Sequence, residues 1–296
     1  MSFSKNLKSE LCKIKAPYCC KYAECYGILL SSKALNFTPF VFTAENEDVV
    51  EHLENLCKKF FNTSFTFSAS GTKKDIFTLK CSNNEAQKIA DAFLSSEKTV
   101  IKNHILADDC CKNAFIRGAF LSTGYIDDPE KSYNLEFVFN NLTLAYEFSL
   151  LLTEIGYPPK WSQRGNYAIL YYKGSEQIED LLAIMGAPEK TLELAEIKVI
   201  KDLKNRLNRT NNCMSYNIDK TVNAAVDQKN AINLIKKAGL YNQLTPELIE
   251  AAELRIKYPE SSLTEILQES GYELSKSGLN HRLQKLIKIA KSKGLM

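Results

Sequence analysis

An internal repeat constrains the fold of this chain more than any other feature of its sequence. Residues 19–32 read CCKYAECYGILLSS and residues 110–123 read CCKNAFIRGAFLST, an offset of 91 positions (110 − 19). Seven of the fourteen aligned positions are identical, whereas unrelated windows of this length agree at about one. The repeat therefore predicts a body built from two similar structural halves.

Both copies of the repeat are expected to be helices that present a face of small residues. Ala23 and Gly27 stand four positions apart in the first copy, as do Ala114 and Gly118 in the second, so each pair shares one helix face. Because small side chains let two backbones approach closely, we expect the two helices to pack on each other. This packing would relate the two halves by a pseudo-twofold axis.

Each half is predicted to follow the order helix, strand, helix, strands, helix. After the first repeat helix we expect a strand at 38–43, a helix at 45–61, strands at 64–68 and 76–80, and a helix at 84–94. After the second we expect a strand at 133–139, a helix at 142–155, a strand at 167–172 and a helix at 176–185. These periodicities predict an α+β body with a sheet exposed on one face.

The second copy carries a motif that resembles one found in DNA-cutting enzymes. IRGAFLSTG (116–124) is similar to the LAGLIDADG motif of homing endonucleases, whose paired motif helices form a two-domain interface. The resemblance implies a metal-binding carboxylate at the eighth letter, and the residues aligned there are Thr123 and Ser32. Neither supplies the charged oxygen that Mg²⁺ prefers. We therefore treat both as degenerate motif positions and predict no metal site, no catalytic residue and no enzyme activity.

The same resemblance implies that the exposed sheets lie on DNA as a saddle. Six basic residues could contact DNA there or could be solvated surface charges: Lys73, Lys74, Lys80, Lys160, Arg164 and Lys173. Residues 1–196 hold 21 Lys and Arg against 25 Asp and Glu, whereas residues 197–296 hold 17 against 10. The acidic body favours solvated charges, and the basic C-terminal third predicts a polyanionic partner for that third.

Two linker helices are expected after the body, at 197–212 and 217–238. The first has an apolar stripe that is predicted to dock on one domain and consists of Val199, Ile200, Leu203 and Leu207. Its opposite side offers donors that could contact DNA phosphates or could belong to an ordinary exposed face: Lys201, Asn205 and Arg209.

Three helices with clear boundary signals end the chain. The first begins at Pro246 after an N-cap at Thr245. The second begins with a capping box at 262–265 and stops at Gly271 after about two turns. The third follows an N-cap at Ser275. A short capped helix, a turn with Gly and a further helix are typical of a helix-turn-helix.

The last of these helices combines an apolar face with a basic, hydrogen-bonding face. Residues 275–296 contain six Lys and Arg and no acidic residue. Such a helix fits the major groove, although an ordinary amphipathic surface helix can look the same. The first turns would reach base edges, and Arg282, Lys285 and Lys288 would hold phosphates. The full set expected at DNA is Ser275, Lys276, Ser277, Asn280, His281, Arg282, Lys285 and Lys288.

Three stretches together resemble the WhiA family of bacteria: FIRGAFLSTG…DPEKSYNLE (115–136), KNRLNRTNNC…NIDKTVNAA (204–225) and LSKSGLNHRLQKL (274–286). The resemblance implies two LAGLIDADG-like repeats around a paired-helix interface at 1–100 and 101–195, linker helices at 196–240 and an all-α helix-turn-helix domain at 241–296. It also implies a DNA-binding transcriptional regulator of cell division and chromosome segregation, or of sporulation.

The expected partners are double-stranded DNA and, through the body, other proteins. We expect no cofactor, and we expect a monomer because the internal repeat already supplies a pseudo-dimer. We expect a cytoplasmic, nucleoid-associated protein, because residues 1–15 lack the apolar core of a signal peptide and no apolar run is long enough to span a membrane. One alternative is a metal-dependent endonuclease with displaced ligands at Asp127 and Asp128. Another is a protein-interaction scaffold that kept the fold after losing the chemistry.

The nine cysteines form no CxxC motif. Cys19–Cys20 and Cys110–Cys111 are adjacent pairs, and adjacent thiols are poorly placed for tetrahedral metal binding. The sequence therefore predicts that the cysteines serve as small apolar residues in a reducing compartment.

Overall fold

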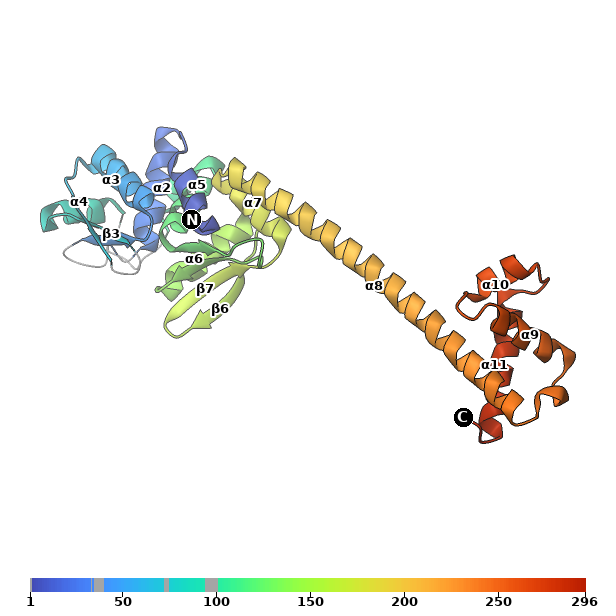
Figure 1. Ribbon diagram of the computed structural model, residues 1–296. Helices are drawn as coiled ribbons and strands as arrows, with labels where there is room; N and C mark the ends of the chain where they lie inside the picture. The colour runs from blue at the N-terminus through green and yellow to red at the C-terminus, as the bar shows by residue number, and fades with distance from the viewer. Residues whose placement is uncertain (1, 33, 35–39, 72–74, 94–100) are drawn as a thin grey trace. The chain divides into compact units, whose positions relative to one another are not determined.

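The computed structural model of the chain describes residues 2–32, 34, 40–71, 75–93 and 101–296 (Figure 1). The chain divides into two compact units, residues 1–201 and 202–296, and each unit has its own apolar core. Within the described ranges, no helix is both long enough and apolar enough to cross a lipid bilayer.

The first unit is built around the two repeat helices, α2 (Tyr18–Ser31) and α5 (Asp109–Thr123). Their predicted pairing is confirmed, because the two backbones touch at the small residues. A Cβ atom on Gly27 would lie 2.3 Å from the Phe115 carbonyl oxygen. A Cβ atom on Gly118 would lie 2.2 Å from the carbonyl oxygen of Glu24. A methyl group at either position would therefore force the two helices apart.

A buried ion pair joins α2 to α5 beside this contact. Arg117 Nη2 lies 2.9 Å from Glu24 Oε2, and the two residues are only 5% and 1% exposed. Arg117 Nη1 donates to the Met185 carbonyl oxygen at 3.0 Å, and His52 Nε2 lies 3.0 Å from Glu24 Oε1. Burial by itself would raise the pKa of Glu24, but the hydrogen bonds with His52 and Arg117 hold that pKa below its ordinary value.

Each half of the first unit contributes one antiparallel sheet, so the α+β prediction is confirmed. The first sheet has the order β1-β3-β2 and consists of β1 (Val41–Ala44), β2 (Thr66–Ser70) and β3 (Ile76–Lys80). The second has the order β4-β5-β7-β6 and consists of β4 (Gly124–Ile126), β5 (Leu135–Phe139), β6 (Lys160–Arg164) and β7 (Tyr167–Tyr172). The accompanying helices are α3 (Glu47–Phe61), α4 (Asn83–Phe93), η2 (Asn103–Leu106), α6 (Leu142–Glu154) and α7 (Ser175–Met185).

The inner face of the second sheet shows why its residues form strands. Along β5, Leu135, Phe137 and Phe139 are buried, and the residues between them are only half-buried. This alternation is typical of an antiparallel strand covered on one face. Phe148 of α6 lies against Phe137 and Phe139, with ring centroids 5.0 and 5.1 Å apart, so the helix and the sheet share one core.

Four elements of the first unit lie outside the predictions, namely α1 (Phe3–Cys12), η2, β4 and β6. Helix α1 buries Phe3, Leu7 and Leu11, about one residue per turn, and this spacing is the signal that could have revealed it. The strand expected at 38–43 begins at Val41 as β1. Residues 38 and 39, and Leu94 at the expected end of α4, lie outside the described residues.

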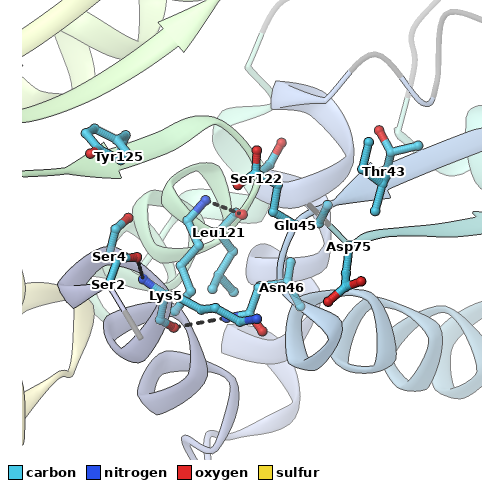
Figure 2. A pocket seen from close by; sticks show the side chains of 14 residues that line it. Ser2, Ser4, Lys5, Thr43, Glu45, Asn46, Asp75, Leu121, Ser122 and Tyr125 are labelled. Carbon is cyan, nitrogen blue, oxygen red and sulfur yellow. Dashed lines mark hydrogen bonds between the residues drawn. The ribbon is translucent and has the colours of Figure 1, made fainter. Parts of the chain in front are cut away.

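Helix α1 holds α3 and α5 in place through hydrogen bonds. Lys8 Nζ donates to the Leu121 carbonyl oxygen at 3.1 Å, and Asn46 Nδ2 donates to the Lys5 carbonyl oxygen at 3.0 Å. Figure 2 shows these groups in an open pocket that Glu45 also lines. Burial lowers the pKa of Lys8 to about 8. The polar groups of this pocket therefore serve mainly to connect elements of the fold.

One helix, α8 (Pro188–Lys237), replaces the two linker helices predicted at 197–212 and 217–238. That prediction was wrong because neither Gly nor a further Pro follows Pro188 within this range, so nothing in the sequence interrupts the helical hydrogen bonds. The start of α8 is capped from α1, since the Glu10 carboxylate accepts from the backbone N–H groups of Glu189 and Lys190 at 2.8 and 3.1 Å.

The apolar stripe near the middle of α8 does not dock as predicted. Each of its four members is more than half exposed: Val199, Ile200, Leu203 and Leu207. Residues 202–220 are all exposed. An apolar stripe at helical spacing thus indicated a helix correctly, but it did not show that a neighbouring element covers it.

The second unit comprises the C-terminal part of α8, η3 (Tyr241–Gln243), α9 (Pro246–Lys257), α10 (Leu263–Ser270) and α11 (Lys276–Ser292). The predicted capping box of α10 is confirmed, because Ser262 N donates to Glu265 Oε2 at 2.6 Å and Glu265 N donates to Ser262 Oγ at 3.3 Å. Gly271 ends α10 with φ = +65°. Ile232 and Ile235 of α8 lie in the same core as the last three helices.

The structure brings together the two cysteine pairs of the repeat. The Sγ atoms of Cys19, Cys20, Cys110 and Cys111 all lie within 4.8 Å of one another. An adjacent pair of cysteines by itself is poorly placed for tetrahedral metal binding, but two such pairs from two helices can surround one ion, so the prediction that excluded these cysteines as metal ligands was too narrow. Burial, together with a hydrogen bond to Cys110, raises the pKa of Cys20 to about 11.

Candidate nucleic-acid interface

Helix α11 is held in the second unit by a regular apolar face. Leu279, Leu283 and Leu286 are almost fully buried, with the spacing expected for one side of a helix. The N-terminus is fixed by Ser275, whose Oγ accepts from the Gly278 backbone N–H at 3.1 Å. The predicted N-cap is therefore confirmed, and the opposite side of α11 is presented to solvent.

The solvent-facing side of α11 carries most of the residues predicted to contact DNA. The exposed members are Ser275, Lys276, Ser277, Asn280, His281, Lys285 and Lys288. No acidic residue occurs from 275 to the end of the chain, so this face combines positive charge with side-chain donors and acceptors. Both are what a helix in the major groove needs.

Arg282 lies on the same helix but differs from the other predicted residues. Its Nη1 donates to Tyr272 Oη at 3.1 Å and lies 3.6 Å from Glu250 Oε2. The Tyr272 hydroxyl in turn donates to the Glu250 carboxylate. The guanidinium that was expected to hold a phosphate thus joins α11 to α9 in this structure.

Arg255 is a structural residue that the sequence predictions missed. It is only 2% exposed, and its Nη1 donates to the carbonyl oxygens of Tyr258 and Ser261 at 3.1 and 2.7 Å. These bonds hold the loop that leads into α10. Burial lowers the pKa of Arg255. Its burial could have been predicted from its position on α9, because Arg255 lies on the same helix face as the buried residues Leu248 and Ala252.

A groove in the second unit lies beside the start of α11. It is lined by residues from α8, from the N-terminus of α10 and from the N-terminus of α11, among them Lys220, Thr221, Ser262, Ser275 and Lys276. Helix N-termini attract anions through their free backbone N–H groups, and the two lysines add positive charge. Lys220 and Thr221 are therefore additional candidates for phosphate contact, which only the folded arrangement reveals.

The three residues predicted on the linker helix fall into two classes. Lys201 Nζ donates to the Pro129 carbonyl oxygen at 2.7 Å and lies 4.7 Å from the centre of the Tyr133 ring. These contacts attach Lys201 to the loop between β4 and β5. Asn205 and Arg209 are fully in the exposed segment of α8, so their donors are accessible.

The predicted saddle residues are exposed wherever the structure describes them. Lys80, Lys160, Arg164 and Lys173 all face solvent, and Lys73 and Lys74 lie outside the described residues. On β6, Trp161 is also 45% exposed. Exposure alone does not distinguish a DNA-binding sheet from a solvated one, so both interpretations of these cations stand.

The degenerate motif positions meet in one pocket, as the repeat predicts. Ser32 and Thr123 both line it. Ser32 Oγ donates to the Leu29 carbonyl oxygen at 2.9 Å, and Thr123 Oγ1 donates to that of Ala119 at 3.0 Å. Among the described residues that line this pocket there is no Asp or Glu. Two hydroxyls already bonded to their own helices do not fit Mg²⁺.

Asp127 and Asp128 do not replace the missing carboxylates of that pocket. The Asp127 carboxylate accepts from Ser132 Oγ at 2.9 Å, and the Asp128 carboxylate accepts from the Glu130 backbone N–H at 3.0 Å. Neither is among the residues that line the pocket of Ser32 and Thr123. Their side chains stabilise the turn after β4, which is a common use of Asp.

Comparison with known proteins identifies the two units. The WhiA LAGLIDADG-like domain model matches residues 112–204, and the WhiA C-terminal HTH domain model matches residues 207–290. The chain is 36% identical to the "Probable cell division protein WhiA" of Clostridium botulinum, with 98% of each chain covered. It is also 36% identical to the protein of the same name from Clostridium tetani, with 98% of this chain and 97% of that relative covered.

A solved structure shares the fold over almost the whole length. The crystal structure of full-length DUF199/WhiA from Thermatoga maritima has a TM-score of 0.58 and 23% sequence identity, and the match covers 99% of both chains. The chain belongs to the WhiA family.

Proposed function

We propose that this protein binds double-stranded DNA with sequence preference through its helix-turn-helix domain. The observation that carries the proposal is the solvent-facing side of α11, where seven predicted DNA contacts are exposed and acidic residues are missing from 275 onward. Lys276, Ser277, Asn280 and His281 would reach base edges from the first turns of α11. Lys285 and Lys288 would hold phosphates.

Three further phosphate contacts follow from the accessible side chains of α8. Asn205 and Arg209 belong to its exposed segment, and Lys220 lines the groove at the N-termini of α10 and α11. Arg282 and Lys201 have other roles in this proposal. Arg282 orients α11 through Tyr272 and Glu250, so its removal would weaken DNA binding indirectly.

A salt titration of affinity for duplex DNA tests the proposal directly. For the full chain, log K should fall with log salt by about 0.9 for each phosphate neutralised, and Lys285→Ala should reduce that slope by about 1 while weakening all sequences alike. His281→Ala should instead relax base preference, at a cost of about 1–3 kcal/mol on the preferred site. Lys229→Ala is a matched control, because Lys229 is exposed but lies on α8 outside the groove. A slope near zero for the unmodified chain would refute the proposal.

The body is proposed to have no nuclease chemistry. Ser32 and Thr123 occupy the positions where a homing endonuclease needs carboxylates, and their pocket has no acidic lining among the described residues. Supercoiled plasmid incubated with the protein and Mg²⁺ or Mn²⁺ should remain intact. Metal-dependent nicking that Asp127→Ala abolishes would restore the endonuclease alternative.

In the cell, we assign the protein to transcriptional regulation linked to cell division and chromosome segregation, or to sporulation. The support is that relatives matched over almost their full length carry the name "Probable cell division protein WhiA". A monomer located at the nucleoid fits this role, because the internal repeat already supplies a two-part body. Mapping chromosomal occupancy by crosslinking should show discrete sites, and uniform occupancy would argue against sequence preference. Protein partners of the body would make use of exposed aromatic residues such as Trp161 and Tyr125.

A further inference from the structure

Four thiols gather at one end of the α2–α5 pair, and none of them is among the residues assigned to DNA binding. Cys19 and Cys20 are the second and third residues of α2, and Cys110 and Cys111 are the second and third residues of α5. Their Sγ atoms all lie within 4.8 Å of one another. In the part of the chain that the structure describes, this is the one cluster of three or more metal-ligating side chains with such a spacing.

The spacing of the thiols matches a single tetrahedral ion. A Zn²⁺ ion binds thiolate sulfur at about 2.3 Å, so two sulfurs of a regular tetrahedron are about 3.8 Å apart. Four sulfurs within 4.8 Å of one another need to move by less than about 1 Å to reach this arrangement. Tetrahedral sites with four sulfur ligands favour Zn²⁺ over harder cations.

The surroundings also suit a bound metal. Cys20 and Cys111 are buried, at 4% and 3% exposure, whereas Cys19 and Cys110 are exposed. The buried pair gives the site a fixed inner half, and the exposed pair gives an ion a path from solvent. All four thiols lie in the first turn of a helix, where the N-terminal backbone N–H groups stabilise negative charge.

Other cysteines of the chain fit the alternative interpretation, in which a cysteine serves as a small apolar residue and binds no metal. Cys25 and Cys57 are fully buried in the core, and Cys213 is exposed by itself on α8. None of these belongs to the cluster. The four-thiol group differs because the internal repeat places two equivalent pairs face to face.

We propose that Cys19, Cys20, Cys110 and Cys111 bind one Zn²⁺ ion that fastens the N-terminal ends of α2 and α5 together. On binding, each thiol loses its proton to solvent and its sulfur forms a bond to the metal, with no change in oxidation state. The ion connects the two repeats at the end opposite Ser32 and Thr123. Its role is structural, since four protein ligands leave no open position for a substrate.

Metal analysis of the full chain tests this assignment. Protein purified under reducing, oxygen-free conditions and dialysed against buffer with trace Zn²⁺ should retain one zinc per chain. Replacing Zn²⁺ by Co²⁺ should give the visible absorption bands of a tetrahedral tetrathiolate complex. Cys19→Ser/Cys110→Ser should lose both signals while leaving the buried pair in place. Cys213→Ser is the matched control for an exposed cysteine and should keep both.

Either of two results would overturn the proposal. The first is wild-type protein that retains no stoichiometric zinc although thiol titration shows all nine cysteines reduced. The second is zinc retained equally by Cys19→Ser/Cys110→Ser. A disulfide between Cys19 and Cys110 that persists after reduction would overturn the proposal as well, and it would assign the cluster to redox chemistry. If the double variant fails to fold, as far-ultraviolet circular dichroism would show, the Co²⁺ spectrum of the wild-type chain decides alone.

Discussion

The two ends of the α2–α5 helix pair contrast in the chemistry that they can support. At the C-terminal ends, Ser32 and Thr123 meet in a pocket, but their hydroxyls are bonded to their own helices. At the N-terminal ends, four thiols converge within 4.8 Å. The C-terminal ends have the position of the LAGLIDADG metal site but lack its carboxylates. The N-terminal ends have four thiols that could bind a metal, at a place where the LAGLIDADG motif has no metal site.

The tightest contacts of this helix pair lie between its two ends. The close contact at Gly27 and Gly118 and the ion pair between Glu24 and Arg117 both lie in the middle of the pair. Neither involves a ligand residue. A family can therefore lose carboxylates at one end, or acquire thiols at the other, while the middle keeps the two halves aligned.

The largest effect is expected from breaking the buried ion pair in the middle. Arg117→Met leaves the Glu24 carboxylate buried without its principal partner, and the free energy of unfolding should fall by about 3–5 kcal/mol. Guanidinium unfolding curves measure this loss. The double variant Glu24→Gln/Arg117→Met should recover part of it, because no unpaired charge remains. A loss below about 1 kcal/mol for the single variant would mean that the pair does not hold the middle together.

A slightly smaller effect is expected from the close contact itself. Gly118→Ala places a methyl group 2.2 Å from the Glu24 carbonyl oxygen, and overpacking against backbone should cost about 3 kcal/mol. Gly174→Ala is the matched control, because its Cβ would meet only the flexible Gln177 side chain at 3.2 Å. Thermal or chemical unfolding of both variants should separate them clearly. Equal stability of the two variants would show that the helices can move apart at no cost.

Next in size is the contribution of the thiol end. If one Zn²⁺ binds there, removing it with a chelator should lower the free energy of unfolding by about 2.7 kcal/mol when free zinc had been a hundredfold above the dissociation constant. Melting curves with and without chelator measure the difference. Cys19→Ser/Cys110→Ser should melt at a temperature that does not depend on zinc, and zinc dependence in that variant would place the ion elsewhere.

Acidification below the ordinary pKa of a glutamate should weaken the middle of the pair. The pKa of Glu24 is held below its ordinary value of 4.5 in the folded protein, so its ionised form stabilises the fold above pH 4.5 and this contribution is lost as the pH falls below that value. Unfolding curves from pH 7 to 3 should therefore show the wild-type protein losing stability faster than Glu24→Gln. Parallel curves for the two proteins would mean that the pKa of Glu24 is the same in the folded and unfolded states.

The smallest effect is expected at the end that resembles a nuclease site. Ser32→Ala removes two local hydrogen bonds, with the Leu29 carbonyl oxygen and the Ala34 N–H, and Thr123→Ala removes one. Each variant should therefore cost at most about 1–2 kcal/mol in unfolding free energy. Affinity for duplex DNA should be unchanged, as a binding titration would show. A large loss of affinity in either variant would give this pocket a function that the hydroxyls' local bonding does not suggest.

Local sequence patterns predicted the helices of this fold well where a segment is repeated or where a helix has capping residues. The repeat predicted the pairing of α2 and α5, and the capping box and Gly271 predicted α10 with its turn. The contacts inside the core could not be predicted from the sequence, because they join residues that are far apart along the chain. Nothing in the local sequence around Glu24 indicates that Arg117, 93 residues later, neutralises it in the core.

The same limit applies to the candidate interface. The exposed side of α11 followed from its 3.6-residue period, so Asn280 and Lys285 could be placed correctly as solvent-facing. The period could not show that Arg282 bonds to Tyr272 and Glu250, or that Lys201 reaches the Pro129 carbonyl oxygen. Long basic side chains can contact a neighbouring helix or loop, so the position of their charged groups depends on the tertiary structure.

Helix α11 contributes both to the core of the second unit and to the proposed DNA-binding surface, so truncating the chain before α11 affects both. Its inner side supplies Leu279, Leu283, Leu286, Ile287 and Ala290 to the core of the second unit, while its outer side carries the proposed reading residues. The core of the first unit contains no residue after Leu194. A premature stop codon just before Lys276 would therefore leave a first unit with its whole core and a second unit with neither its full core nor its reading surface. If the body binds a partner and α11 binds DNA as proposed, such a truncated product would compete for that partner without binding DNA, and late nonsense alleles should be dominant in a strain that also carries the intact gene.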